Sequence, residues 1–197
     1  MEQPFNADAL VRRLGRLSLQ ARLAFLLSCA ERLIPNYAVF SRHHGWGNPG
    51  VLRHALDLGW SYLSGNWVER GDIEGCLARC KDVTPDTEDF VSEHVSAGLD
   101  AAVCCAFTLE LLLKDDSKKV MEGASLARDT VDMHVQALEN LDPRDSELEQ
   151  KIFRHPLMQR ELKHQREDLE MLERMDLSRR DIEALARRWR SPVASDS

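Results

Sequence analysis

Apolar residues recur at three- and four-residue spacing along almost the whole chain, which is the period of an amphipathic α-helix. Ser18 is placed as the N-cap of a helix whose apolar stripe reaches Ile34. Pro35 is expected to interrupt that helix and to begin the next one. Glycine and asparagine residues predict a loop over His43–Gly50.

The run Ala101–Leu113 contains only two polar residues, Thr108 and Glu110. A helix that is apolar on nearly all sides is a buried one, so we predict a central helix near 95–113. Regular alternation is absent, which argues against a strand. Glu110 is either a perturbed functional acid or a residue at the rim of the bundle. We favour the rim, because buried carboxylates are rare unless they are paired.

Further helix starts are predicted at Thr84–Asp86, after His155–Pro156 and at Ser178. The helix after Pro156 repeats apolar positions with the four-three spacing of a coiled-coil seam. Together these patterns predict an all-α, single-domain bundle of about seven to nine helices over residues 1–190, followed by a disordered tail over 191–197. The seam consists of Met158, Leu162, Gln165, Leu169 and Leu172.

The chain has 197 residues, of which 43% are apolar and 30% are charged, and a net charge of −7. These values fit one globular domain, and no apolar stretch has the length that we expect of a membrane span. Residues 81–150 hold six basic against seventeen acidic side chains, whereas 151–190 hold eleven against eight. The basic ends can therefore meet the acidic middle, within the fold or between subunits, although solvated helix faces are the simpler interpretation. The net negative charge argues against a nucleic-acid partner.

Five cysteines lie mostly inside apolar helical patterns. An odd number of buried thiols predicts a reducing compartment, so we expect the protein in the cytoplasm. Leu23–Ala30 imitates the apolar region of a signal sequence, but it continues as an amphipathic helix and secretion is not expected. The vicinal Cys104–Cys105 pair lies in the apolar run, where burial makes thiols inert.

Candidate metal ligands form incomplete sets. Glu161 and His164 have the Glu-x-x-His spacing that di-iron bundles use twice, but a second copy is absent from the sequence. His43, His44 and His54 surround the glycine-rich loop, where histidines are commonly exposed to solvent. We therefore predict no metal and no other cofactor.

Paired carboxylates are the next candidates. Asp86 with Asp89, and Asp129 with Asp132, would each put two acids on one helix face, as magnesium–diphosphate enzymes do. Such pairs are only slightly more frequent in this sequence than chance predicts. The dipole of a helix N-terminus also explains Asp86 and Asp89.

A polar cleft beside the predicted helix break at Pro35 is the remaining candidate site. Broken helices expose backbone groups and can line a cleft. The alternative is that these side chains cap helices and pack in the core. The candidate binding residues are Glu31, Asn36, Tyr37, Arg53, Asp57, Asp86, Asp89 and Asp100.

Several blocks of the sequence resemble a known family. Cys29–Tyr37 reads CAERLIPNY, and it is followed by Leu52–Trp60, Pro85–Phe90, Val95–Ala102 and His155–Gln159. These blocks resemble the YjaG family of bacterial proteins of unknown function, over most of the chain. The resemblance implies an all-helical cytosolic protein and implies no reaction.

We expect from these observations a cytosolic protein that acts by association and without catalytic chemistry. The four-three seam predicts a homodimer, and an unidentified protein partner is the other possibility. The alternative is a small-ligand-binding protein or a hydrolase that uses the polar cleft near Pro35.

Overall fold

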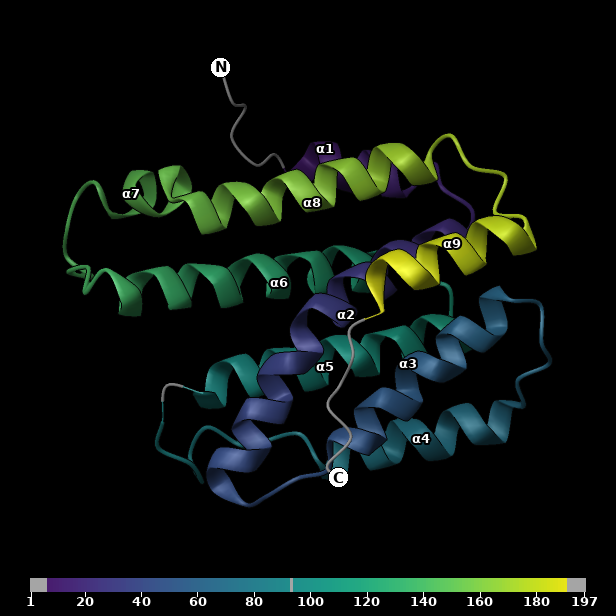
Figure 1. The fold of residues 1–197 in the computed structure, drawn as a ribbon, viewed down its shortest axis with the longest axis horizontal. Coiled ribbons are helices and arrows are strands. Elements are labelled where there is room, and N and C mark those ends of the chain that lie inside the picture. The colour runs from purple at the N-terminus through teal and green to yellow at the C-terminus, as the bar shows by residue number, and fades with distance from the viewer. Residues whose placement is uncertain (1–6, 93, 191–197) are drawn as a thin grey trace.

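The chain folds into a bundle of helices, seen in a computed structural model that describes residues 7–92 and 94–190. Those residues form nine helices and no strand, which confirms the prediction of an all-α single-domain fold. Long helices α6 and α8 lie side by side, while α3, α4 and α9 lie near the crossing of α2 and α5 (Figure 1). The helices are α1 (Ala7–Leu14), α2 (Leu19–His44), α3 (Pro49–Leu63), α4 (Arg70–Asp82), α5 (His94–Leu113), α6 (Ser117–Leu138), α7 (Leu148–Arg154), α8 (Pro156–Leu172) and α9 (Arg179–Trp189).

Capping residues define the ends of α2 and the start of α3. The Ser18 side chain accepts a hydrogen bond from the Ala21 N–H at 3.2 Å, as the sequence predicts for an N-cap. Gly45 ends α2 in a left-handed conformation with φ of 61°. Asn48 then caps α3. The glycine-rich loop is shorter than predicted, because only residues 45–48 lie outside a helix.

The predicted helix break at Pro35 is wrong, because α2 continues through it. Proline removes one helical hydrogen bond, and here its ring lies on an exposed face of the helix. Ile34 and Tyr37, on either side of it, are fully buried. We attribute the continuity of α2 to this packing, which outweighs the loss of one hydrogen bond.

Helix α5 is the buried central helix that the sequence predicts, with ten of its 20 residues buried. Its Gly98 allows close approach of α2, since a Cβ at that position would lie 2.9 Å from the Cβ of Phe40. Glu110 lies at the rim of the bundle, where Lys119 Nζ approaches its carboxylate at 3.2 Å. The rim interpretation of Glu110 therefore agrees with its position.

The helix start predicted at Thr84 is wrong, since the chain between α4 and α5 is not helical. Thr84 Oγ1 donates to the carbonyl of Cys80 at 2.8 Å, so Thr84 closes the end of α4 instead. Asp86 accepts a backbone N–H two residues later in a turn. Phe90 packs on Phe40 with ring centroids 5.3 Å apart. This tertiary contact holds the segment against α2 and overrides the local capping signal.

The four-three seam of α8 faces the core of its own chain, where α8 packs on α2 and α6. Four of the five seam residues are at most 4% exposed. The seam therefore gives no support to a homodimer, which stays a prediction. The four buried residues are Met158, Gln165, Leu169 and Leu172.

Helix α9 begins with the predicted cap. Ser178 Oγ accepts from the Asp181 N–H at 3.3 Å, and Asp181 Oδ2 accepts from the Ser178 N–H at 3.0 Å. The apolar side of α9, which includes Trp189, is buried against the bundle. The tail predicted over 191–197 lies outside the described residues.

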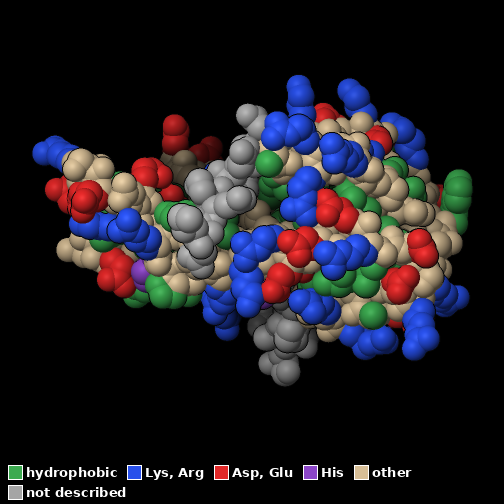
Figure 2. Space-filling view, turned by 90° about the horizontal axis from the view of Figure 1, so that it is seen from above, with side chains coloured by type: hydrophobic (Ala, Val, Ile, Leu, Met, Phe, Trp, Pro, Cys, Tyr) green, Lys and Arg blue, Asp and Glu red, His purple; other side chains and the backbone are tan. Residues whose placement is uncertain are grey.

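The far ends of α6 and α8, together with α7, form a narrow lobe beside the broad body of the bundle (Figures 1 and 2). A small separate core of Val135, Ile152 and Met158 fills this lobe. The lobe is thus stabilised by its own apolar contacts and not by the main core.

Helices α2 and α5 are long and apolar enough to meet a length-and-composition test for membrane spans. Their 18-residue windows have mean hydropathies of 1.2 and 1.6, and 72% and 56% of these windows is buried inside the bundle. Core helices of folded bundles meet the same test, so this is weak support for a membrane span.

Candidate functional site

Two adjacent charged residues of α2, Glu31 and Arg32, each lie at the centre of a polar network. Glu31 is fully buried, and the Arg32 side chain is 23% exposed. Consecutive residues of an α-helix point about 100° apart, so the two side chains reach different neighbouring helices. A charge removed from water is tolerated only with partners, and each network supplies them.

The first, the Glu31 network, joins α2 to α3 and consists of Glu31, Arg53, Asp57 and Trp60. Arg53 Nη1 and Nη2 donate to Glu31 Oε2 and Oε1 at 2.8 and 2.7 Å, in the two-bond geometry that favours arginine with carboxylate. The Trp60 indole Nε1 donates to Glu31 Oε1 at 2.8 Å. Arg53 Nε donates to Asp57 Oδ1 at 3.1 Å. The buried carboxylate of Glu31 is therefore fully engaged in structural contacts.

The second, the Arg32 network, joins α2 to α8 and α9 and consists of Arg32, Glu161, Gln165, Asp168 and Trp189. Arg32 donates two hydrogen bonds to Glu161, both at 2.9 Å, and one to Asp168 at 3.0 Å. Gln165 Nε2 donates to Glu161 at 2.8 Å, and Trp189 Nε1 donates to Asp168 at 3.0 Å. One guanidinium thus bridges two buried carboxylates.

The end of α9 connects the two networks. Trp60 and Trp189, which donate to one network each, have ring centroids 6.3 Å apart. The next residue, Arg190, donates to Asp57 Oδ1 at 2.6 Å. The end of α9 therefore contacts α3 and α8 through hydrogen bonds to carboxylates as well as through apolar packing.

Partner charges dominate the electrostatics of the Glu31 network. Burial by itself would lower the pKa of Arg53, but the hydrogen bond and charge of Glu31, together with Asp57, raise the pKa above its ordinary value. Arg53 therefore stays charged beside Glu31 and Asp57.

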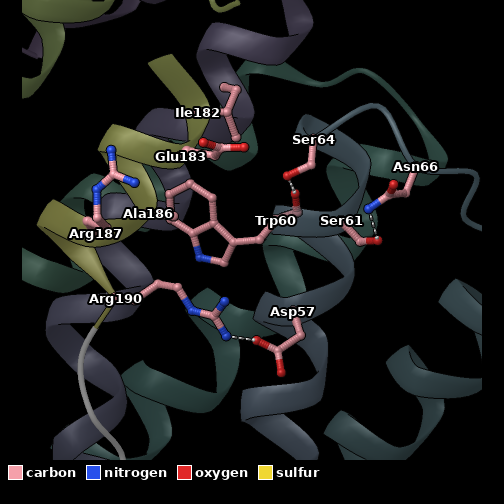
Figure 3. A pocket seen from close by; sticks show the side chains of 10 residues that line it. All are labelled: Asp57, Trp60, Ser61, Ser64, Asn66, Ile182, Glu183, Ala186, Arg187 and Arg190. Carbon is pink, nitrogen blue, oxygen red and sulfur yellow. Dashed lines mark hydrogen bonds and ion pairs between the residues drawn. The ribbon is translucent and has the colours of Figure 1, made fainter. Parts of the chain in front are cut away.

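A groove of about 520 Å³ lies on the surface between α3 and α9 (Figure 3). The Asp57–Arg190 pair closes one end, and Trp60 forms part of its floor. Polar side chains from α3 and the chain after it lie along one wall, and α9 supplies the other. The polar residues along these two walls are Ser61, Ser64, Asn66, Glu183 and Arg187.

Comparison with known proteins gives the family. The profile of a protein family of unknown function, DUF416, matches residues 9–195. The chain belongs to the DUF416 family. This confirms the resemblance seen in the sequence, because relatives of this DUF416 protein bear the YjaG name.

Two curated relatives are the uncharacterized proteins YjaG of Escherichia coli (strain K12) and of Salmonella typhimurium (strain LT2). They are 27% and 26% identical to this chain over 173 residues, which is 88% of this chain and 85% of each relative. The crystal structure of a DUF416 family protein from Shewanella baltica OS155 at 1.91 Å resolution matches with a TM-score of 0.81 and 26% identity. That match covers 95% of this chain and 93% of the other.

The structure of this DUF416 protein brings together three of the eight predicted cleft residues, namely Glu31, Arg53 and Asp57. Tyr37 lies elsewhere: its hydroxyl donates to the carbonyl of Val83 at 2.5 Å.

The other four candidates lie apart from the Glu31 network. Asn36 is half-buried on α2. Asp86 and Asp89 are exposed in the segment before α5. Asp100 on α5 accepts from the Thr130 hydroxyl of α6 at 2.7 Å. The eight residues therefore do not form one cleft, because α2 does not break at Pro35.

The fold shifts the pKa of Asp100 above its ordinary value. Burial raises its pKa, and the hydrogen bond from Thr130 partly offsets that effect. Asp100 sits between two helices and has no neighbouring nucleophile or base from the predicted set. It is best explained as a contact between α5 and α6.

The five cysteines are free and buried. Burial raises the pKa of Cys29 to about 12 and also raises the pKa values of Cys104 and Cys105. A thiol is nucleophilic as the thiolate, so these three side chains are poorly suited to nucleophilic chemistry.

Histidine rings do gather near the glycine-rich loop, where solvent-exposed histidines were the favoured expectation. His43 contacts His44 and His94, with ring centroids 4.8 and 5.1 Å apart. Thus His94, and not His54, completes the group. Burial lowers the pKa of His44, with smaller contributions from the neighbouring histidines. Among the residues that the structure describes, no three His, Cys, Asp or Glu side chains are arranged to hold a metal ion.

Sequence reasoning missed the Arg32 network. Its signal was present in the predicted seam, since Glu161, Gln165 and Asp168 continue the same four-three spacing. Three polar residues on the apolar side of a helix indicate a buried polar network, and Arg32 and Trp189 are the donors that it required. Nothing local in the sequence pairs those donors with α8.

Proposed function

We propose that this DUF416 protein acts by association, as a binding protein without catalytic chemistry, and that it binds through the surface of α3 and α9. The observation that carries the proposal is a difference between the buried and the surface charges. The buried carboxylates of Glu31, Glu161 and Asp168 accept hydrogen bonds inside the bundle, whereas α9 presents arginines that make no ion pair with any residue that the structure describes.

The surface of α9 is strongly basic on an otherwise acidic protein. Residues 179–190 hold five arginines and two acids, although the whole chain has a net charge of −7. Arg179 is 3.5 Å from Glu183, and Arg190 pairs with Asp57. In the part of the chain that the structure describes, Arg180, Arg187 and Arg188 make no ion pair. Unpaired guanidinium groups beside a groove favour recognition of a partner with negative charge.

An exposed tryptophan lies next to the groove. Trp67 is 88% exposed, and it directly follows Asn66, which lines the groove. Tryptophan and arginine are the residues that most often dominate the binding energy of protein interfaces. The combination of Trp67 with Arg187 therefore supports a protein-binding surface more than a site for a small molecule.

The alternative, a hydrolase or small-ligand site built on Glu31, finds less support. A catalytic carboxylate must reach a substrate, but Glu31 is fully buried and accepts hydrogen bonds from Arg53 and Trp60. Moving Glu31 toward a substrate would leave the Arg53 charge without its main partner.

Homodimer formation and a cytoplasmic location belong to the same proposal. The five free cysteines fit a reducing compartment. The coiled-coil seam no longer motivates a dimer, so a dimer contact has to use another surface, and the basic face of α9 is the one that this proposal selects.

Site-directed photo-cross-linking tests the proposed surface. A photoreactive phenylalanine analogue replaces Trp67, and the matched control carries it at Val91, which is 97% exposed in the segment before α5. We expect a discrete adduct from position 67 alone, and we expect Arg187→Glu to abolish it. Equal yields from both positions, or an adduct that is insensitive to Arg187→Glu, would overturn the proposed surface.

A further inference from the structure

We infer that the α3–α9 groove receives an acidic segment from a second copy of this chain. The inference rests on the proposed function and names the partner for the same surface. The acidic segment is residues 139–149, which run from the end of α6 into the first turn of α7; we call it the acidic tip.

The acidic tip carries an excess of negative charge. It holds five acids and one arginine, at the end of the narrow lobe. Asp145 pairs with Lys151, and Glu139 lies 3.4 Å from His155. The remaining three acids make no ion pair among the described residues and are exposed. They are Asp142, Glu147 and Glu149.

The groove lining itself holds two arginines and two acids, and the surplus of positive charge lies on α9 beside it. Arg190 and Arg53 share Asp57, so the pair at the end of the groove is already balanced. Arg187 lines the groove and makes no ion pair within residues 7–92 and 94–190, and Arg188 follows it on α9. On the opposite wall Asn66 Nδ2 donates to Ser61 Oγ at 3.3 Å, which leaves the Ser61 hydroxyl proton and the second amide proton of Asn66 as donors. A carboxylate entering here would meet unpaired guanidinium and neutral donors, which is the arrangement that binds carboxylates well.

The tip and the groove of one copy lie too far apart to meet. Trp189 contacts Asp168, and with a rise of 1.5 Å per residue Asp168 lies about 18 Å along α8 from Pro156. The acidic tip lies beyond that end of α8, on the far side of α7 (Figure 1). In Figure 2 the narrow lobe likewise projects well away from the broad part of the molecule. The tip is therefore available to a groove on another copy.

A two-fold pair satisfies both surfaces at once. If the tip of each copy occupies the groove of the other, the same contact forms twice and the assembly closes at two subunits. A nucleic acid is the less favoured occupant of the basic face, because the chain is acidic overall and Glu183 and Asp57 border the same groove. A peptide segment also offers backbone N–H groups to those two carboxylates.

Charge exchange tests the inference on the full-length purified protein. The groove variant is Arg187→Glu with Arg188→Glu, and the tip variant is Glu147→Lys with Glu149→Lys. Matched controls are Arg166→Glu on α8 and Glu88→Lys before α5, both exposed and outside the two surfaces. Native mass spectrometry and sedimentation velocity measure the dimer dissociation constant at salt concentrations of about 0.05 and 0.5 M.

We expect a dimer at low salt that weakens at high salt. The groove variant and the tip variant should each raise the dissociation constant by about tenfold or more, since several exposed ion pairs become repulsive. The combined groove and tip variant should restore the dimer, and the two controls should leave it unchanged.

Four results would overturn the inference. A dimer that ignores both charge reversals, or one that the combined variant does not restore, excludes the tip as occupant. A chain that is monomeric at tens of micromolar also excludes the tip as occupant of the groove. If position 67 then cross-links to another protein, the proposed function still holds although the dimer does not. Tighter binding of a single-stranded oligonucleotide probe to the unmodified groove than to the groove variant would assign the surface to nucleic acid instead.

Discussion

Replacing Glu31 with glutamine removes the buried charge that holds Arg53, at nearly constant side-chain volume. Glu31 is fully buried, and the Arg53 side chain is 18% exposed. Breaking one side of a buried ion pair costs about 3–5 kcal/mol, because the other charge is left without its partner. Arg53 keeps Asp57 at 3.1 Å, so we expect a somewhat smaller loss, about 2–4 kcal/mol.

Urea unfolding followed by tryptophan fluorescence measures this change, because Trp60 donates to Glu31 itself. The matched control is Glu74→Gln. Glu74 carries the same kind of ion pair, with Arg70 at 2.7 Å, but its side chain is 51% exposed. We expect the control to lower the free energy of unfolding by at most about 1 kcal/mol.

A double variant separates the charge effect from other causes. Replacing both Glu31 and Arg53 with methionine removes both charges together, so it should cost less than the sum of the two single methionine variants. The unpartnered Trp60 N–H leaves a residual cost of about 1–3 kcal/mol. The reasoning is refuted if Glu31→Gln is as mild as Glu74→Gln, or if the two methionine variants are simply additive.

Three further predictions rest on other parts of the fold. Gly98→Ala should lower the free energy of unfolding in urea by about 1–3 kcal/mol, because its Cβ would lie 2.9 Å from a phenylalanine of α2. The control Gly75→Ala meets open space and should stabilise α4 by up to about 1 kcal/mol. Equal effects of the two substitutions would contradict this packing. Burial raises the pKa of Asp100 in the folded protein above 3.8, so ionisation of Asp100 weakens folding as the pH rises above that value. Asp100→Asn should therefore stabilise the folded protein at pH 7 by less than about 1 kcal/mol, and the asparagine keeps an oxygen that accepts the hydrogen bond from Thr130. That gain should vanish below pH 3.8, and a gain that persists there would show another cause. Cys29, with its pKa raised to about 12, should resist a thiol reagent near neutral pH until urea unfolds the chain, and rapid labelling of the native protein would contradict its burial.

The local sequence predicts the helices well where their own residues decide the outcome. Ser18 and Ser178 cap the helices that they were expected to cap, and the apolar run of α5 is buried at the centre. It predicts poorly where a contact from elsewhere competes. Pro35 does not break α2, and Thr84 does not start a helix, because packing against distant side chains outweighs a local preference.

The candidate site was predicted only in part. Glu31, Arg53 and Asp57 come together because they lie on two consecutive helices. The later candidate acids, Asp86, Asp89 and Asp100, lie apart from these three residues. The groove could not be predicted either, since it needs α9 to return along α8 and place Arg187 opposite α3.

The sequence by itself determined the all-α class, the central helix, most helix ends and the uneven distribution of charge, because spacing and capping are local properties of the chain. The tertiary structure alone decided which charged residues are buried with partners and which remain on the surface. Arg32 meets Asp168 across a separation that no local pattern encodes, while Arg187 on α9 makes no ion pair in the part of the chain that the structure describes. Burial of a charge depends on what the whole fold packs around it, and that is why the surface proposed for binding became visible only in three dimensions.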